Sequence, residues 1–176
     1  MHDERNFKLF VGLGNPSREY ARTYHNVGLT CLDFLKDRWA NASSWQKEKN
    51  FHFLRLPDKI LVKSSVFMNE SGSAVGSACR KFKISYAELL VIHDDADLAV
   101  GAYKLSFGRG SAGHHGIDSV IAALGTDEFW RLRLGVRSTH GKASDFVLAK
   151  INKTDREKIY GVLAEITEKV IEKDLP

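Results

Sequence analysis

The sequence predicts an α/β fold: a single domain with a mixed, mostly parallel, twisted sheet that carries helices on both faces. Short apolar runs of strand length alternate along the chain with segments whose apolar residues recur every three or four positions, as on one face of a helix. The run Leu89–Ile92 is apolar throughout, which is typical of a strand buried on both faces. The length of 176 residues suits one domain, and we expect residues 1–176 to form it.

The first predicted strand, Lys8–Leu13, is a short apolar run that ends in a Gly-Asn-Pro turn fixed by Pro16. From Asn26 to Trp39 the apolar residues follow helical spacing and predict an amphipathic helix that faces the core. This places His25 near the N-terminus of that helix.

The next segments predict a hairpin and a second helix. Strands Phe51–Leu56 and Lys59–Lys63 flank a turn at Pro57-Asp58. The helix Asn69–Phe82 carries small residues on its packing face, and the simplest structural role for Asn69 is to cap it.

Polar residues follow the buried strand at 89–92, which we expect to stop abruptly at the acidic segment 93–97. A further strand, Ala102–Phe107, leads into the glycine-rich segment 108–113 and then into a helix that ends at Gly125.

Two elements complete the prediction. Residues Trp130–Val136 alternate as a strand, and Thr154–Lys173 forms an amphipathic helix with Thr154 as N-cap and Glu157 at the capping-box spacing.

The composition indicates a soluble, non-secreted protein. Hydrophobic residues make up 43% and charged residues 27% of the chain, which excludes disordered and low-complexity classes. The net charge of +4 is compatible with an anionic partner. Cys31 and Cys79 lie in helix-like apolar patterns, so we expect buried thiols in a reducing compartment. Neither a signal peptide nor an apolar run of membrane-spanning length is found, and we expect a cytoplasmic location.

Three polar clusters follow predicted strands: Asn15 with His25, Asn69, and Asp94 with the adjacent His114-His115 pair. Because ligands of open α/β sheets gather where strands end, these clusters could converge on one site. Each also has a purely structural explanation, since Asn15 could serve only the turn before Pro16 and the acidic residues could form a solvated loop.

A metal site is an alternative, because histidine and aspartate are metal-ligand types. No spaced set of the H-E-x-x-H kind is present, and adjacent histidines on an extended segment point to opposite faces, so we expect no metal. The glycine-rich segment matches neither the P-loop nor the dinucleotide-binding pattern, so no nucleotide cofactor is expected.

Short motifs are distributed over nearly the whole chain. They are Val11-Gly-Leu-Gly-Asn-Pro16, Thr23-Tyr-His-Asn-Val-Gly28, Phe67-Met-Asn-x-Ser-Gly72, Ile92-His-Asp-Asp-x-Asp-Leu98, Gly113-His-x-Gly116, Arg131-Leu-Arg-Leu-Gly135 and Asp145-Phe-Val-Leu148. These motifs resemble those of the bacterial-type peptidyl-tRNA hydrolase family, and they occur in the family's order and at close to its spacing.

The resemblance implies metal-free hydrolysis of the ester that joins a peptide to the 3′ end of tRNA. It places His25 on the family's catalytic histidine and Asp94 on its supporting carboxylate. Chemistry agrees, because ester hydrolysis near neutral pH needs a base, and imidazole, with an unperturbed pKa near ~6.5, supplies one. Asn15 matches the residue that distinguishes blocked from free aminoacyl-tRNA. Asn69 matches an asparagine that could orient water or donate to the oxyanion.

Other residues match or suggest RNA contacts. Tyr20 and Phe67 correspond to positions that line the site for the tRNA terminus, where aromatic rings can stack on a base. We expect phosphate contacts from basic residues around the cleft, although Arg131 and Arg133 could instead form an ordinary exposed strand face. These basic candidates are Lys104, Arg109, Arg131 and Arg133. The implied partner is peptidyl-tRNA, with no cofactor, no DNA and no membrane, and we expect a monomer.

The chain departs from the family at three places. Tyr24 replaces an arginine, His115 replaces a substrate-binding asparagine, and the segment 108–113 is less rich in glycine. An imidazole offers fewer hydrogen bonds than an amide and loses its acceptor on protonation. These changes leave a second hypothesis open, an RNA-binding relative without turnover. A third, a metal-dependent phosphohydrolase, would use Asp94, Asp95 and Asp97.

Overall fold

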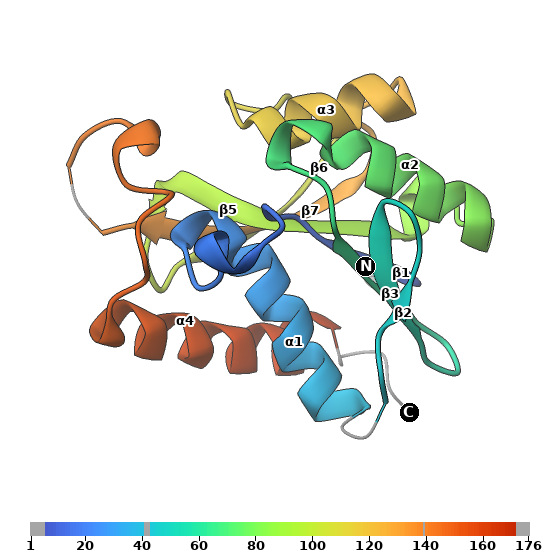
Figure 1. Cartoon of the computed structure of the whole chain (residues 1–176), viewed down its shortest axis with the longest axis horizontal. Coiled ribbons are helices and arrows are strands. Elements are labelled where there is room, and N and C mark those ends of the chain that lie inside the picture. Colours follow the sequence, from blue (N-terminus) through green and yellow to red (C-terminus); the bar gives the residue numbers. More distant parts are fainter. Residues whose placement is uncertain (1–5, 41–42, 139, 172–176) are drawn as a thin grey trace.

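Within residues 6–40, 43–138 and 140–171, which the computed structural model describes, seven strands form one sheet in the order β2-β3-β4-β1-β5-β7-β6 (Figure 1). The central strands β4, β1, β5 and β7 are parallel, whereas the pairs β2/β3, β3/β4 and β6/β7 are antiparallel. The strands are β1 (Leu9–Gly12), β2 (Gln46–Lys47), β3 (Phe51–Arg55), β4 (Ile60–Ser64), β5 (Leu89–Ala99), β6 (Tyr103–Phe107) and β7 (Trp130–Arg137).

Helices cover both faces of this sheet, with α2 and α3 on one side and α1 and α4 on the other (Figure 1). The predicted α/β class with a mixed sheet is therefore confirmed. The α-helices are α1 (Val27–Trp39), α2 (Ser71–Phe82), α3 (His115–Leu124) and α4 (Lys153–Ile166). The shorter turns are η1 (Arg18–Tyr20), η2 (Tyr24–Asn26), η3 (Met68–Glu70), η4 (Tyr86–Glu88), η5 (Ala143–Asp145) and the π-helical η6 (Thr167–Ile171).

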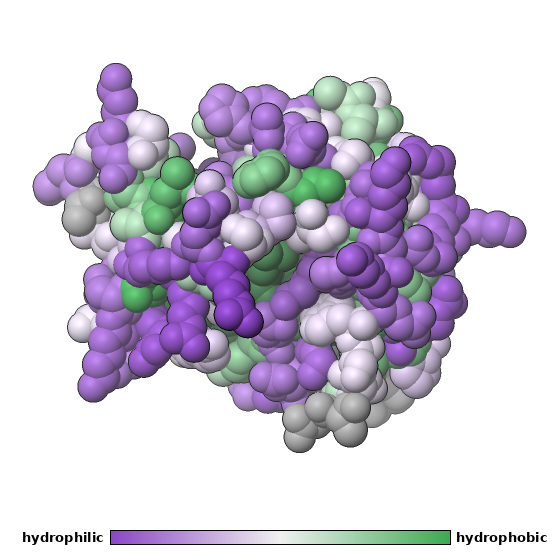
Figure 2. Space-filling model, viewed as in Figure 1, coloured by the Kyte–Doolittle hydropathy of each residue, from purple (hydrophilic) through white to green (hydrophobic). Residues whose placement is uncertain are grey.

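Strand β5 separates two hydrophobic cores. Leu90 and Ile92 face the core formed with α1 and α4, whereas Leu89 and Val91 face the core formed with α2 and α3. All four side chains are fully buried, which explains why the first four positions of this strand are all apolar. Figure 2 shows that hydrophilic side chains cover most of the outer surface seen in that view.

Helix α1 lies unusually close to the sheet because glycines meet there. A Cβ atom on Gly28 would lie 2.4 Å from the carbonyl oxygen of Ile92, and one on Gly12 would lie 2.5 Å from that of Gly28. No larger residue fits without displacing backbone atoms. This contact places the turn η2, which precedes α1, beside the carboxyl end of β1 and the middle of β5.

Both predicted cysteine thiols are buried and unpaired, as expected. Burial raises the pKa of Cys31 to about 12 and that of Cys79 to about 11. In the described ranges, no helix has the length and apolar character needed to cross a membrane.

The predicted stop of a strand at His93 is wrong, because β5 continues to Ala99. Its polar half stays paired with β7, with Asp94 opposite Leu134 and Asp95 opposite Gly135, and the register then shifts before Ala99. Backbone pairing therefore continues where the apolar sequence pattern ends.

Two predicted helix starts are also wrong. Helix α2 begins at Ser71 after the turn η3, so Asn69 lies in that turn and does not cap the helix. Helix α4 is capped by Asn152, whose side chain accepts a hydrogen bond from the Asp155 amide at 2.8 Å, and not by Thr154. The predicted end of the α4 segment at Lys173 lies outside the described residues.

Helices α2 and α3 meet at Gly72, and this contact generates a stability prediction. A Cβ atom on Gly72 would lie 2.0 Å from the carbonyl oxygen of Ser119, so we expect Gly72→Ala to destabilise the fold by about 1–3 kcal/mol through overpacking. Gly161, exposed in the middle of α4, has nothing within 4 Å of such an atom, and Gly161→Ala should stabilise the fold by about 0.5–1 kcal/mol. Urea unfolding followed by circular dichroism measures both; equal unfolding free energies for the two variants would contradict the packing argument.

Candidate active site

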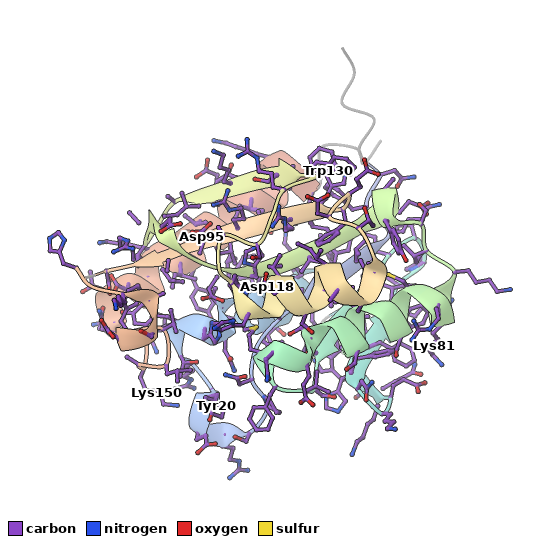
Figure 3. The ribbon with its side chains drawn as sticks, turned by 90° about the horizontal axis from the view of Figure 1, so that it is seen from above. Tyr20, Lys81, Asp95, Asp118, Trp130 and Lys150 are labelled. Carbon is purple, nitrogen blue, oxygen red and sulfur yellow. The ribbon has the colours of Figure 1, made fainter. Side chains whose placement is uncertain are left out.

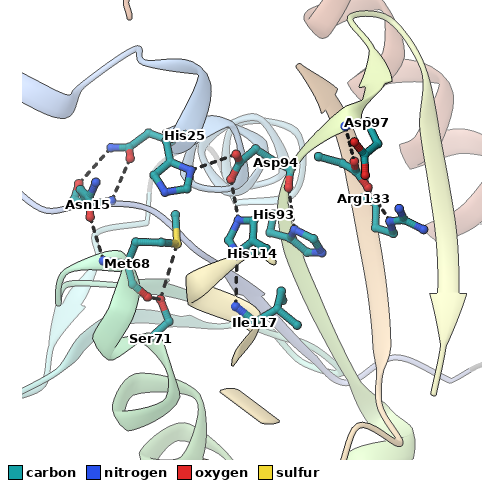
Figure 4. Close-up of polar contacts among 12 residues, drawn as sticks. Asn15, His25, Met68, Ser71, His93, Asp94, Asp97, His114, Ile117 and Arg133 are labelled. Carbon is teal, nitrogen blue, oxygen red and sulfur yellow. Dashed lines mark hydrogen bonds and ion pairs between the residues drawn. The ribbon is translucent and has the colours of Figure 1, made fainter. Parts of the chain in front are cut away.

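The side chain of Asp94 joins two histidines that are far apart in the sequence. Its Oδ2 atom lies 2.9 Å from Nδ1 of His25, and its Oδ1 atom lies 2.9 Å from Nε2 of His114 (Figure 4). Asp94 comes from β5, His25 from the turn η2, and His114 from the residue before α3. The predicted contact between His25 and Asp94 is therefore present, with His114 as a further partner.

Asp94 is only 2% exposed, yet the two rings keep it ionised. Burial alone would raise its pKa, but the interactions with His114 and His25 outweigh burial and hold the pKa of Asp94 well below its usual range. The carboxylate therefore accepts hydrogen bonds on both oxygens.

The hydrogen-bond partners determine where each imidazole carries its proton. Nδ1 of His114 accepts a bond from the backbone N–H of Ile117 at 3.2 Å, so the proton of the neutral ring lies on Nε2 and is donated to Asp94. Burial opposes a charge on His114, but Asp94 outweighs it and raises the pKa of this histidine. The Ile117 N–H acts against protonation, because a proton on Nδ1 would face another donor.

His25 is oriented in the complementary way. Its Nδ1–H donates to the ionised Asp94, which leaves the lone pair on Nε2. The side chain is 16% exposed, so it is reachable from solvent, whereas Asp94 behind it is not. This arrangement makes Nε2 of His25 a base whose conjugate acid a buried carboxylate would stabilise.

Asn15 is fixed beside this cluster by bonds from two directions. Its Oδ1 accepts from the Met68 amide at 2.7 Å, its backbone N–H donates to Oδ1 of Asn26 at 2.8 Å, and its carbonyl accepts from Nδ2 of Asn26 at 2.9 Å (Figure 4). Since Oδ1 is occupied, the Nδ2 donors of Asn15 are the atoms that a ligand could use. Asn26 follows His25, so these bonds also tie Asn15 to the histidine's turn.

Asn69 follows Met68, whose amide binds Asn15, and is exposed in the turn η3. The preceding Met68 is buried against the start of α3, since a Cβ atom on Gly116 would lie 2.5 Å from its sulfur and 2.9 Å from Cε1 of His114. Phe67, the residue before Met68, is 49% exposed. Its ring meets the ring of Tyr20 edge-on, with centroids 6.3 Å apart.

A cleft of about 610 Å³ opens beside the histidine cluster. Its walls come from the glycine-rich segment, from the polar half of β5, from arginines of β7 and from residues around η5. Of the predicted site residues, the cleft lining includes His25, Asp94, Arg109, His115, Arg131 and Arg133, but not Asn15, Tyr20, Phe67, Asn69 or Lys104.

Arg131 does not lie on an exposed strand face, which corrects one interpretation of the sequence. It is 2% exposed, and its guanidinium donates to the carbonyl of Gly110 at 2.9 Å and to that of Arg109. In this conformation its donors hold the glycine-rich segment against β7.

The other basic candidates are more accessible. Nε of Arg133 donates to Oδ2 of Asp95 at 2.6 Å, and Lys104 is its register partner on β6. Both Lys104 and Arg109 are exposed.

Side chains of metal-ligand type do meet in the described part of the chain, because one donor atom from each of His25, Asp94 and His114 lies within 4.8 Å of the others. Their surroundings do not favour a metal. A metal-bound histidine normally donates its second N–H to an acceptor, whereas the second nitrogen of His114 faces the N–H donor of Ile117. His93, part of the metal pattern considered from the sequence, points Nδ1 at the Asp94 carbonyl at 2.7 Å.

The sequence placed His114 and His115 together in a polar cluster with Asp94, but a role in the site was predicted only for His115. His115 is the first residue of α3, is exposed and lines the cleft, whereas the ring that contacts Asp94 belongs to His114. The sequence position of His114, directly before a helix, was the signal that could have identified it. A residue at this position can cap the helix, as His114 does, so its side chain turns inward while that of the next residue faces outward.

The chain is similar to proteins of known family. The family model described as peptidyl-tRNA hydrolase matches residues 9–174. The chain belongs to the peptidyl-tRNA hydrolase family. The peptidyl-tRNA hydrolase of Akkermansia muciniphila is 40% identical over 93% of this chain and 87% of its own length, and that of Variovorax paradoxus is 42% identical over 86% and 75%. The crystal structure of the Acinetobacter baumannii peptidyl-tRNA hydrolase superposes with a TM-score of 0.85 at 27% identity, covering 96% of this chain and 88% of that one.

The depressed pKa of Asp94 predicts how this member of the peptidyl-tRNA hydrolase family responds to acid. A carboxylate whose pKa is lowered by folding contributes stability above its unfolded pKa of ~3.9, and the contribution is lost as pH falls below that value. We expect Asp94→Asn to cost on the order of 2–3 kcal/mol at pH ~6, the range for bonds to a charged group, and less at pH ~3. Urea unfolding of both proteins at each pH tests this, and a difference that does not change with pH would refute it.

Proposed function

We propose that the protein hydrolyses the ester bond between a peptide, or an N-blocked aminoacyl group, and the 3′ end of tRNA, and so returns free tRNA for reuse. The observation that carries the proposal is the hydrogen bond from His25 to the buried, ionised Asp94, which leaves Nε2 as a base at the surface of a cleft. Membership of the peptidyl-tRNA hydrolase family supports the substrate.

In the proposed mechanism, Nε2 of His25 takes a proton from water while the water oxygen attacks the ester carbonyl. Asp94 stabilises the imidazolium that forms, and His114 holds the second oxygen of Asp94 so that the carboxylate keeps its orientation. The tetrahedral intermediate then breaks the bond to the ribose oxygen, which takes the proton back from His25. The products are a tRNA hydroxyl and the carboxylic acid of the peptide, which loses its proton to water and leaves as the carboxylate. No metal ion is needed for either step.

Asn15 is the candidate for distinguishing blocked from free aminoacyl-tRNA. Its Oδ1 is held by Met68, so it offers Nδ2 donors that suit the carbonyl of an N-acyl group. A free aminoacyl group would bring an ammonium donor to the same place, and two donors do not pair. Asn69, in the neighbouring turn, is the candidate donor to the developing oxyanion or to the attacking water.

RNA contacts come from two groups of side chains in this proposal. Tyr20 and the exposed Phe67 form an aromatic pair on which a terminal base could stack. Lys104, Arg109 and Arg133 are the candidates for phosphate contacts, whose strength should fall with salt. For Arg131 we replace the phosphate role with a structural one, because its donors already bind the glycine-rich segment. His115, on the cleft wall, contacts substrate in place of the family's asparagine.

A purely RNA-binding role, the alternative considered from the sequence, would require neither the base nor the carboxylate, and no observation on the described residues favours it. We further propose that residues 1–176 act as one domain and as a monomer in the cytoplasm, where dropped peptidyl-tRNA is produced, without DNA as a partner.

The decisive prediction concerns His25→Ala. We expect this change to abolish cleavage, by at least about 10²-fold as for loss of a general base, while tRNA binding changes little because His25 is held against Asp94 and is not among the basic residues proposed to contact phosphates. The measurement is single-turnover release of N-acetyl-aminoacyl groups from tRNA, with and without EDTA, beside unblocked aminoacyl-tRNA.

Chelator-insensitive cleavage confined to the blocked substrate and dependent on His25 is the expected result. Equal turnover by the wild type and by His25→Ala would contradict the assignment of His25 as the base. Binding without cleavage by the wild type would instead support the RNA-binding alternative.

A second prediction concerns His115, which stands where the family pattern has an asparagine. We expect His115→Asn to raise kcat/KM, because an amide presents both donors and an acceptor rigidly at the cleft wall where imidazole presents one of each. Initial rates with N-acetyl-aminoacyl-tRNA measure the effect. A lower kcat/KM would mean that the surrounding site has adapted to histidine.

A further inference from the structure

The backbone of the turn that carries His25 is held by a segment from near the other end of the chain. The N–H of His25 donates to the carbonyl of Val147 at 2.7 Å, and the N–H of Tyr24 donates to that of Ala149 at 3.2 Å. In the opposite direction, the N–H of Ile151 donates to the carbonyl of Arg22 at 2.9 Å. We call residues 146–151 the strap.

Side chains add to this pairing. Nζ of Lys150, labelled near Tyr20 in Figure 3, donates to the carbonyl of Ala21 at 2.7 Å. The ring of Tyr24 meets that of Phe146 edge-on, with centroids 6.4 Å apart. The strap therefore lies against residues 21–25, which include the first part of the turn η2.

The strap leads directly into the N-terminus of α4, where the side chain of Tyr24 ends. The Tyr24 hydroxyl donates to Oδ2 of Asp155 at 2.6 Å. Nδ2 of Asn152, the cap of α4, donates to the same oxygen at 2.9 Å and to the Tyr24 hydroxyl at 3.2 Å. The main chain of Tyr24 is thus attached to the strap, and its side chain to the helix that follows the strap.

This network is buried and satisfied. Tyr24 is 4% and Asp155 6% exposed. Burial, together with Asp155, raises the pKa of Tyr24, so its hydroxyl keeps the proton that it donates. A buried carboxylate that loses one of its donors is costly, so the phenol and the carboxylate hold each other in place.

We propose that Tyr24 is a positioning residue for His25: it fixes the turn η2 between the strap and α4, and thereby the imidazole ring relative to Asp94. The inference rests on the proposed function, for which His25 is the base. The 2.9 Å bond from His25 to Asp94 needs a fixed turn, because displacement of a reacting group by about 1 Å can cost about 10²-fold in rate.

The test is Tyr24→Phe, which removes the hydroxyl and keeps the ring against Phe146. We expect kcat for N-acetyl-aminoacyl-tRNA to fall about 10-fold with KM changed less than about 2-fold, since Tyr24 is buried away from substrate. Asp155→Ala should have the same effect, and the double variant should lose no more than either single one. Asp155→Asn keeps an oxygen acceptor and should retain most of kcat.

A control separates positioning from loss of stability. Ile159→Val also lies in α4 and is buried, so it should cost about 0.5–1.5 kcal/mol of stability, yet we expect kcat to remain unchanged. The His25 imidazole resonances in an NMR spectrum provide a second readout, and they should shift in Tyr24→Phe but not in Ile159→Val.

Unchanged kcat and unchanged His25 resonances in Tyr24→Phe would overturn the inference, and so would an equal fall of kcat in Ile159→Val. If the wild type does not cleave blocked aminoacyl-tRNA, the proposed function fails. The His25 resonances then decide whether Tyr24 positions the ring.

Discussion

The site depends on the two hydrogen bonds that the buried carboxylate of Asp94 accepts from histidines. Asp94 lies in the polar half of β5 and binds two histidines. His25 comes from the turn before α1, and His114 is the residue before α3. A charge that is 2% exposed is tolerated only with such partners. Because both rings direct their protons at Asp94, the remaining nitrogen of each ring has a definite role: that of His114 caps a helix and that of His25 is available to substrate.

Close packing makes this meeting possible. Gly28 and Gly12 let α1 approach the carbonyl groups of β1 and β5, and Gly116 lets the start of α3 approach Met68. The two helices belong to different cores, on opposite faces of the sheet. Consequently each imidazole depends on the apolar contacts of a different core, and the two sides are joined through Asp94 of β5 and through the bond from the Met68 amide to Asn15.

The parts of the fold that the sequence predicted well are those governed by apolar periodicity. The β1, β3, β4 and β7 strands and helix α1 lie within a residue or two of the predicted ranges, because burial selects those residues directly. The extension of β5 beyond His93 was missed, since it depends on backbone pairing to β7 that polar side chains do not reveal. The same limit applies to Asn152 and His114, whose capping roles depend on which residue enters the helix first, and to Arg131, whose burial depends on a loop folding over it.

The attachment of His25 to Val147 has a consequence for how such a protein is made. A ribosome synthesises the histidine early and the residues that hold its backbone late, and throughout synthesis the growing chain is itself joined to tRNA by the kind of ester that the finished site would cleave. Until Val147 and Asp155 have left the ribosome, the turn at His25 has neither the strap nor α4 to hold it. The order of the sequence therefore delays the completion of the proposed catalytic base until most of the chain is complete.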